Sequence, residues 1–168
     1  DGVDSAFTRF EQGWGMPDIG RLYESRKKLF VVDQERALRD HQAVEYRLVV
    51  PVGEPELRVT LAYTDPLGTT AAAKALVNDL DLIVISPNGS RYYGNHGLLD
   101  TNVSRAGGTP DRINNVENVF LHEPAAGTWQ VIVASHRIAW DQHGETPEWD
   151  QDYALVVCGV EPDQPPLN

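Results

Sequence analysis

The segment of residues 76–95 most constrains how this chain can fold. Residues 80–85 have the length and composition of a buried strand, and the turn sequence Pro87-Asn88-Gly89 returns the chain as a hairpin over residues 90–93. Alternate side chains of a strand share a face, and both faces of this one are apolar beyond Asp81. Two apolar faces are typical of a strand that lies between two layers. The sequence therefore predicts a layered β protein built around this hairpin.

Two acidic residues stand at the start of this strand. Asp79 and Asp81 are two positions apart, so they point the same way and are separated by only about 7 Å along the backbone. Carboxylates at the rim of a core need a cation, backbone amides or a raised pKa. Oxygen ligands of this kind suit Ca²⁺, which makes the pair a candidate metal site. The alternative is that both side chains are solvated at the end of an edge strand.

Turn sequences separate further runs of alternating residues along the chain. The spacing predicts one antiparallel hairpin of residues 44–50 with 57–63, a second of 116–121 with 128–135, and a last strand over 152–160. Seven or eight strands at this spacing predict an all-β fold, namely an antiparallel jelly-roll β-sandwich.

The ends of the chain differ in character from this central part. Residues 1–30 predict a short helical extension with a helix that opens at Pro17 and Asp18. Residues 31–43 are polar and mixed, and predict a linker or a first edge strand. The sandwich then occupies residues 44–160, and the proline-rich residues 161–168 are expected to fray.

A long polar segment of residues 94–115, here called the long loop, follows the central hairpin. Loops longer than about 12–15 residues are uncommon in compact domains unless they are functional or disordered. We therefore expect a specific feature to order the long loop.

Composition excludes several classes of function. The net charge of −11 argues against nucleic-acid binding, and no run of apolar residues approaches the length of a membrane span. The single cysteine, Cys158, lies in an apolar run, where a buried structural thiol is expected and no internal disulfide is possible.

Five motifs occur in an order that resembles a known family. They are Leu76-Val-Asn-Asp-Leu-Asp-Leu82, Ser86-Pro-Asn-Gly89, Tyr93-Gly-Asn95, Asn114-Asn-Val-Glu-Asn-Val119 and Ala126-Gly-Thr-Trp129. Together they resemble the β-sandwich that follows the catalytic domain in many subtilisin-like serine proteases, which is related in plan to the P-domain of proprotein convertases. Upstream, Gln12-Gly-Trp-Gly15 and the helix after it resemble the last segment of the catalytic domain itself.

The resemblance implies a non-catalytic C-terminal module of a secreted subtilisin-like serine endopeptidase. Residues 1–30 would then be a remnant of the catalytic domain, and a chain that opens at Asp1 without an initiator methionine is expected to be an excised piece. The module would stabilise the catalytic domain of its own parent chain by packing against it. The apolar side chains of residues 7–22 would lie on that domain, so in isolation they should self-associate or pack weakly.

The chain itself lacks the sequence signatures of a protease or esterase. Its six serines are Ser5, Ser25, Ser86, Ser90, Ser104 and Ser135. None lies in a Gly-Thr-Ser helix start or in a Gly-x-Ser-x-Gly elbow, and no His-Glu-x-x-His motif is present. A complete small hydrolase is therefore disfavoured, and we expect no enzymatic activity from this chain alone.

Relatives of this kind often bind calcium, and the resemblance implies two structural Ca²⁺ sites. The first would combine Asp79 and Asp81 with Asp65, Asn115 and Glu117, and the second would use the long-loop residues Asn95, Asp100, Asn102 and Asp111. His96 replaces the acidic residue expected after Asn95 in the second site.

These positions also have structural interpretations. The asparagines of residues 114–118 would satisfy buried backbone groups, and Glu117 would pair with Arg112.

A function of another class is an independent carbohydrate- or protein-binding jelly roll. It requires Trp140 and Trp149 to be solvent-facing and side by side, whereas a structural role would have them cover the open end of the sandwich.

Overall fold

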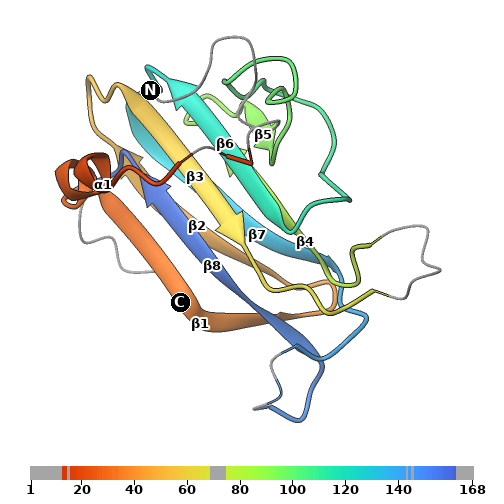
Figure 1. The fold of residues 1–168 in the computed structure, drawn as a ribbon. Coiled ribbons are helices and arrows are strands. Elements are labelled where there is room, and N and C mark those ends of the chain that lie inside the picture. Colours follow the sequence, from red (N-terminus) through yellow and green to blue (C-terminus); the bar gives the residue numbers. More distant parts are fainter. Residues whose placement is uncertain (1–12, 15, 69–74, 143, 145, 162–168) are drawn as a thin grey trace.

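Two antiparallel four-stranded sheets lie face to face in the computed structural model, which describes residues 13–14, 16–68, 75–142, 144 and 146–161 (Figure 1). Eight strands and one short helix are found in the described part of the chain. The prediction of an all-β sandwich of seven or eight strands with a short helical extension is confirmed.

The front sheet in Figure 1 contains β1 (Leu29–Arg39), β8 (Asp150–Cys158), β3 (Glu56–Ala62) and β6 (Val116–His122), in that spatial order. The rear sheet contains β2 (Ala43–Val50), β7 (Gly127–Arg137), β4 (Asp79–Ile85) and β5 (Arg91–Tyr93), again in spatial order. The strands pair as β1 with β8, β2 with β7, β3 with β6 and β4 with β5, and these four pairs alternate between the two sheets. This is the jelly-roll arrangement. β1 is an edge strand, and it occupies most of the segment that the sequence left open between a linker and an edge strand.

The central hairpin is confirmed, because β4 pairs with β5 through residues 83–85 and 91–93. The two other predicted hairpins are wrong. β2 pairs with β7, while β3 pairs with β6 and β8, so the turns after β2 and β6 carry the chain from one sheet to the other. The alternation of apolar and polar residues identifies the buried face of each strand but not the sheet that contains the strand. The sequence therefore did not distinguish a hairpin within one sheet from a connection between the two sheets.

The core fills the space between the two sheets. Leu57, Val59 and Leu61 on β3 are fully buried, and so are the alternate β4 residues Leu80 and Leu82. Two buried tyrosines add a polar link across this core, because the hydroxyls of Tyr46 on β2 and Tyr153 on β8 lie 2.6 Å apart. The two sheets are therefore joined by both apolar packing and a hydrogen bond.

Helix α1 (Ile19–Ser25) lies against one end of the front sheet (Figure 1). The Asp18 side chain caps it by accepting a hydrogen bond from the Arg21 N–H, and the Arg21 guanidinium pairs with Glu56 at the start of β3. No residue of α1 is buried. Among the described residues no helix is long and apolar enough to span a membrane.

Candidate functional site

The two acidic side chains at the start of β4 share one partner. Arg112, from the long loop, places Nη1 3.2 Å from Oδ1 of Asp79, and the same nitrogen contacts Oδ1 of Asp81. The common contact confirms that the two carboxylates point the same way. Both aspartates are buried, and burial raises the pKa of the Asp81 carboxyl against the lowering effect of Arg112. The expected cation at this rim is thus a guanidinium of the chain itself.

Glu117 occupies the most enclosed acidic position of this region. Its side chain is fully buried, and Oε2 accepts a 2.8 Å hydrogen bond from the Leu82 N–H. Oε1 is buried and has no hydrogen-bond partner among the described residues. Burial raises the pKa of Glu117 to about 9, with further contributions from Asp81, Asp111 and Asp79. Glu117 is therefore a neutral carboxylic acid at pH 7, and Arg112 pairs with the two aspartates and not with Glu117.

Gly94 explains how such a side chain fits at the sheet edge. A Cβ at Gly94 would lie 2.7 Å from the Glu117 Cβ, closer than real Cβ contacts allow. The Gly94 N–H also donates to the Leu82 C=O at 3.0 Å. The N–H and the C=O of Leu82, which both face the β5 side of β4, therefore have hydrogen-bond partners in Glu117 and Gly94.

Asp65 and Asn115, also proposed as ligands of the first site, bind backbone groups. Asp65 accepts hydrogen bonds from the N–H groups of Val77 and Asn78, at 2.9 and 2.7 Å, and so fixes the chain before β4. Asn115 is exposed, and its Nδ2 donates to the Tyr63 C=O at 2.8 Å. Asn115 thus binds a backbone carbonyl, which is the structural interpretation given above for the asparagines of residues 114–118.

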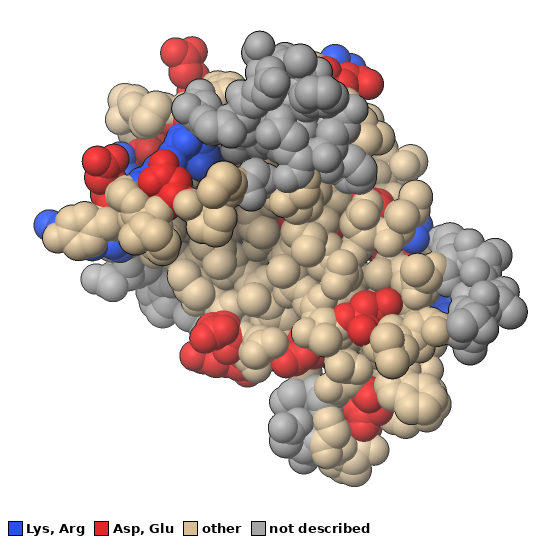
Figure 2. Space-filling model, in the orientation of Figure 1, with Lys and Arg blue, Asp and Glu red and all other residues tan. Residues whose placement is uncertain are grey.

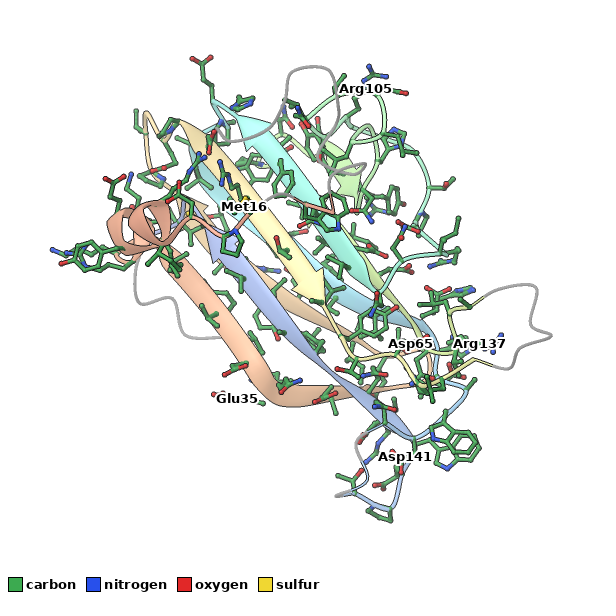
Figure 3. The ribbon with its side chains drawn as sticks, viewed as in Figure 1. Met16, Glu35, Asp65, Arg105, Arg137 and Asp141 are labelled. Carbon is green, nitrogen blue, oxygen red and sulfur yellow. The ribbon has the colours of Figure 1, made fainter. Side chains whose placement is uncertain are left out.

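Of the four residues proposed for the second site, Asn95 and Asp111 are in contact, whereas Asp100 pairs elsewhere. Asn95 Nδ2 donates to Asp111 Oδ2 at 2.6 Å, while Asn95 Oδ1 accepts from the Asn118 N–H. Asp100 pairs with Arg105 at 3.3 Å on the exterior of the long loop. Figure 3 shows Arg105, the partner of Asp100, far from Asp65 of the first proposed site. Asn102 is half-buried in the same loop.

These donors do not fit a calcium ion as the described residues are arranged. Ca²⁺ takes about six to eight oxygen ligands, several of them ionised carboxylates. Here a guanidinium already lies between Asp79 and Asp81, and Oε2 of Glu117 already accepts from the Leu82 N–H. No group of three or more His, Cys, Asp or Glu side chains that could hold a metal is found within the described ranges. Calcium binding remains a prediction that this geometry does not favour.

Asn78 is a structural centre that the sequence analysis missed. It is fully buried, its Oδ1 accepts from the N–H groups of Ala139 and Trp140, and its Nδ2 donates to Gln151 Oε1. The motif Leu76-Val-Asn-Asp-Leu-Asp-Leu82 contains Asn78, but sequence alone does not distinguish an asparagine that binds buried backbone groups from one that lies beside a metal site.

A hollow of about 720 Å³ separates the N-terminal segment from the outer face of the front sheet. One wall contains Met16, Ile19 and Leu22, and the other contains Phe120 and Val156. Met16 is 89% exposed and Ile19 is 70% exposed, so the apolar side chains around the hollow are open to solvent. Figure 2 shows few charged side chains over the middle of this sheet face, and Figure 3 shows Met16 above it.

The tryptophans at the opposite end of the sandwich are open to solvent. Trp140 and Trp149 are each 60% exposed and belong to the segment between β7 and β8. This exposure fits the solvent-facing requirement of the carbohydrate-binding interpretation, and the prediction that the two rings cover the open end of the sandwich stays untested.

Comparisons with known proteins find relatives that are named as serine proteases. No family model matches the chain. It is 29% identical over 126 residues to the serine protease/ABC transporter B family protein tagD of Dictyostelium discoideum, covering 67% of this chain and 7% of the relative. It is also 29% identical over 105 residues to tagA of the same family and organism, covering 61% of this chain and 5% of the relative. The chain thus spans less than a tenth of the length of these relatives.

Among solved structures, a Bacillus licheniformis lipase in its propeptide form matches 81% of this chain and 22% of its own length, with 14% identity and a TM-score of 0.42.

Proposed function

We propose that this chain is a non-catalytic C-terminal module of a secreted subtilisin-like serine endopeptidase, and that it stabilises the catalytic domain by packing against it. The relatives named as serine proteases and the five ordered motifs support the protease context. Secretion rests on the family resemblance alone. Calcium is not part of this proposal, because Arg112 already compensates the acidic pair.

The observation that carries the proposal is the open apolar surface around α1. Ile19 and Leu22 are 70% and 54% exposed beside a largely uncharged sheet face, although α1 is fixed to the sandwich through the Arg21–Glu56 pair. Exposed apolar side chains that border a hollow are typical of a surface that another protein covers. In the proposed parent, the catalytic domain would cover this surface. Residues 7–12 of the segment expected to contact it lie outside the described residues.

The test is the thermal inactivation of the full-length parent protease. The double variant Ile19→Glu and Leu22→Glu should shorten the half-life of peptidase activity several-fold at a temperature where the unmodified protein loses activity slowly, because it places charge in the covered surface. Leu67→Glu is the matched control, since Leu67 is 99% exposed in the segment after β3. Equal half-lives for all three proteins would contradict the proposal.

The isolated chain gives two further checks of the same proposal. It should hydrolyse no peptide substrate, because the sequence has no activated nucleophile. It should also self-associate in sedimentation experiments through the surface around α1, and the Ile19→Glu and Leu22→Glu variant should remain monomeric.

A second candidate function is carbohydrate binding through Trp140 and Trp149. Their shared exposure of 60% is the observation that favours it, because indole rings stack on sugar faces when both are accessible. Calorimetric titration with cellohexaose and chitohexaose should then show binding that Trp140→Ala and Trp149→Ala abolish. The absence of binding by the unmodified chain would remove this candidate.

A further inference from the structure

We propose that Arg112 takes the place of a divalent metal ion in this sandwich, so that the long loop is ordered by nitrogen donors of the chain and remains ordered without calcium. This inference does not depend on the proposed protease context. It concerns the packing of residues 94–115 against β4.

The first argument is the position of the guanidinium. A single nitrogen, Nη1 of Arg112, contacts Oδ1 of both Asp79 and Asp81, which is where an ion bridging two carboxylates would lie. The side chain of Arg112 is 27% exposed, and those of the two aspartates are 11% and 9% exposed. A charge pair with this little solvent contact is weakly screened, and a second cation at the same point would be repelled by Arg112.

The second argument is that the carboxylate of Asp111, the residue before Arg112, also has only nitrogen donors as its hydrogen-bond partners. Its Oδ1 accepts from the N–H groups of Ile113 and Asn114 at 2.9 and 3.2 Å. Its Oδ2 accepts from the side-chain amides of Asn95 and Asn114 at 2.6 and 2.7 Å. Four N–H donors therefore surround this carboxylate, and they supply the positive partial charge that a metal would otherwise supply.

The third argument is the way these contacts fix both ends of the long loop. At its start, the Asn95 N–H donates to the Asn118 C=O, and the Asn118 N–H donates to Asn95 Oδ1, at 2.8 and 2.9 Å. Near its end, Arg112 binds the loop to Asp79 and Asp81 at the start of β4. Loss of Arg112 would free this end and leave Asp79 and Asp81 facing each other without a counter-charge.

The test compares Arg112→Gln with Arg105→Gln in the 168-residue chain. Arg105 is the matched control, because it lies in the same loop and pairs with Asp100 on the exterior. We expect the unmodified chain and Arg105→Gln to melt at the same temperature in CaCl₂ and in EGTA. Arg112→Gln should melt lower by roughly 4–10 °C in EGTA, because removing one partner of a partly buried ion pair leaves uncompensated charge.

Two further measurements, hydrogen–deuterium exchange and the same substitution in an Asp81→Asn background, show whether the loss of stability comes from the contact of Arg112 with β4. Amides of residues 94–115 should exchange faster in Arg112→Gln than in Arg105→Gln. In an Asp81→Asn background, Arg112→Gln should lower the melting temperature by less than half as much, because its principal partner has lost its charge. The proposal is overturned if EGTA lowers the melting temperature of the unmodified chain by several degrees. It is equally overturned if Arg112→Gln matches Arg105→Gln, if loop exchange is unchanged, or if the two backgrounds respond alike.

Discussion

Glu117 on β6 and Leu82 on β4 join the two sheets of the sandwich through a 2.8 Å hydrogen bond between the buried carboxyl and the backbone N–H. β5 pairs with β4 only from Ile83 onward, so Leu82 has no neighbouring strand on that side. The Gly94 N–H, directly after β5, binds the Leu82 C=O, and the Glu117 carboxyl supplies the remaining partner by accepting from the Leu82 N–H.

The state of Glu117 predicts how stability depends on pH. The pKa of Glu117 rises from 4.5 to about 9 on folding, so between these values the folded chain holds a proton that the unfolded chain has released. Stability from this group is complete below pH 4.5 and is lost as the pH rises towards 9, by up to about 1.4 kcal/mol per pH unit. Glu117→Gln keeps a neutral acceptor for Leu82, so the variant should be more stable than the unmodified chain at pH 8 and within about 1 kcal/mol of it at pH 5.

Urea denaturation at pH 5, 6, 7 and 8 measures this difference. Glu35→Gln is the control of equal charge, because Glu35 is exposed on β1 (Figure 3). A difference between Glu117→Gln and the unmodified chain that stays constant across these pH values would show that Glu117 does not hold its proton in the folded state.

The contact between Gly94 and Glu117 gives a prediction of the opposite sign. Gly94→Ala places a methyl group 2.7 Å from the Glu117 Cβ, and relieving such an overlap in a buried site costs about 1–3 kcal/mol. The melting temperature of the 168-residue chain should fall by roughly 3–10 °C. Gly144→Ala should leave it unchanged, because a Cβ there meets nothing within 4 Å. Equal melting temperatures for the two variants would refute the close approach of β6 to Gly94.

The hydroxyl pair in the core tests the jelly-roll arrangement directly. Tyr153→Phe removes one hydroxyl and leaves that of Tyr46 buried without its partner, which costs about 1–3 kcal/mol. Replacing both tyrosines by phenylalanine should cost less than either single change, since no unpaired hydroxyl then remains. A double-mutant cycle in urea measures the coupling. Strictly additive losses would mean that β2 and β8 do not face each other here.

The sequence was sufficient for every strand but β1 and for the buried faces, because the alternation of apolar and polar residues indicates which side chains are buried. Leu57, Val59 and Leu61 alternate on β3 as expected, and Asp79 and Asp81 share a face. It was not sufficient for strand pairing beyond the central hairpin. The turns after β2 and β6 resemble hairpin turns locally, and only the closure of the whole core decides that they connect different sheets.

The candidate site was predictable only in part, because local sequence does not reveal contacts between distant segments of the chain. The sequence indicated that the Asp79 and Asp81 pair needs a cation, but its source lies 31 residues from Asp81 in the long loop. Spacing alone does not reveal that Arg112 returns to β4, and the structural alternative considered for Arg112 was a pair with Glu117. The neutrality of Glu117 follows from its complete burial, a property of the assembled sheets and the Gly94 contact.

Hydrogen–deuterium exchange of this chain, alone and within the full-length parent protease, tests the proposed function most directly. The account predicts slower exchange in the full-length protein for amides of residues 16–25 and for the adjoining strand β6, with unchanged exchange in the segment of Trp140 and Trp149 at the other end. Equal exchange around α1 in the two proteins would contradict the claim that this surface packs against a catalytic domain.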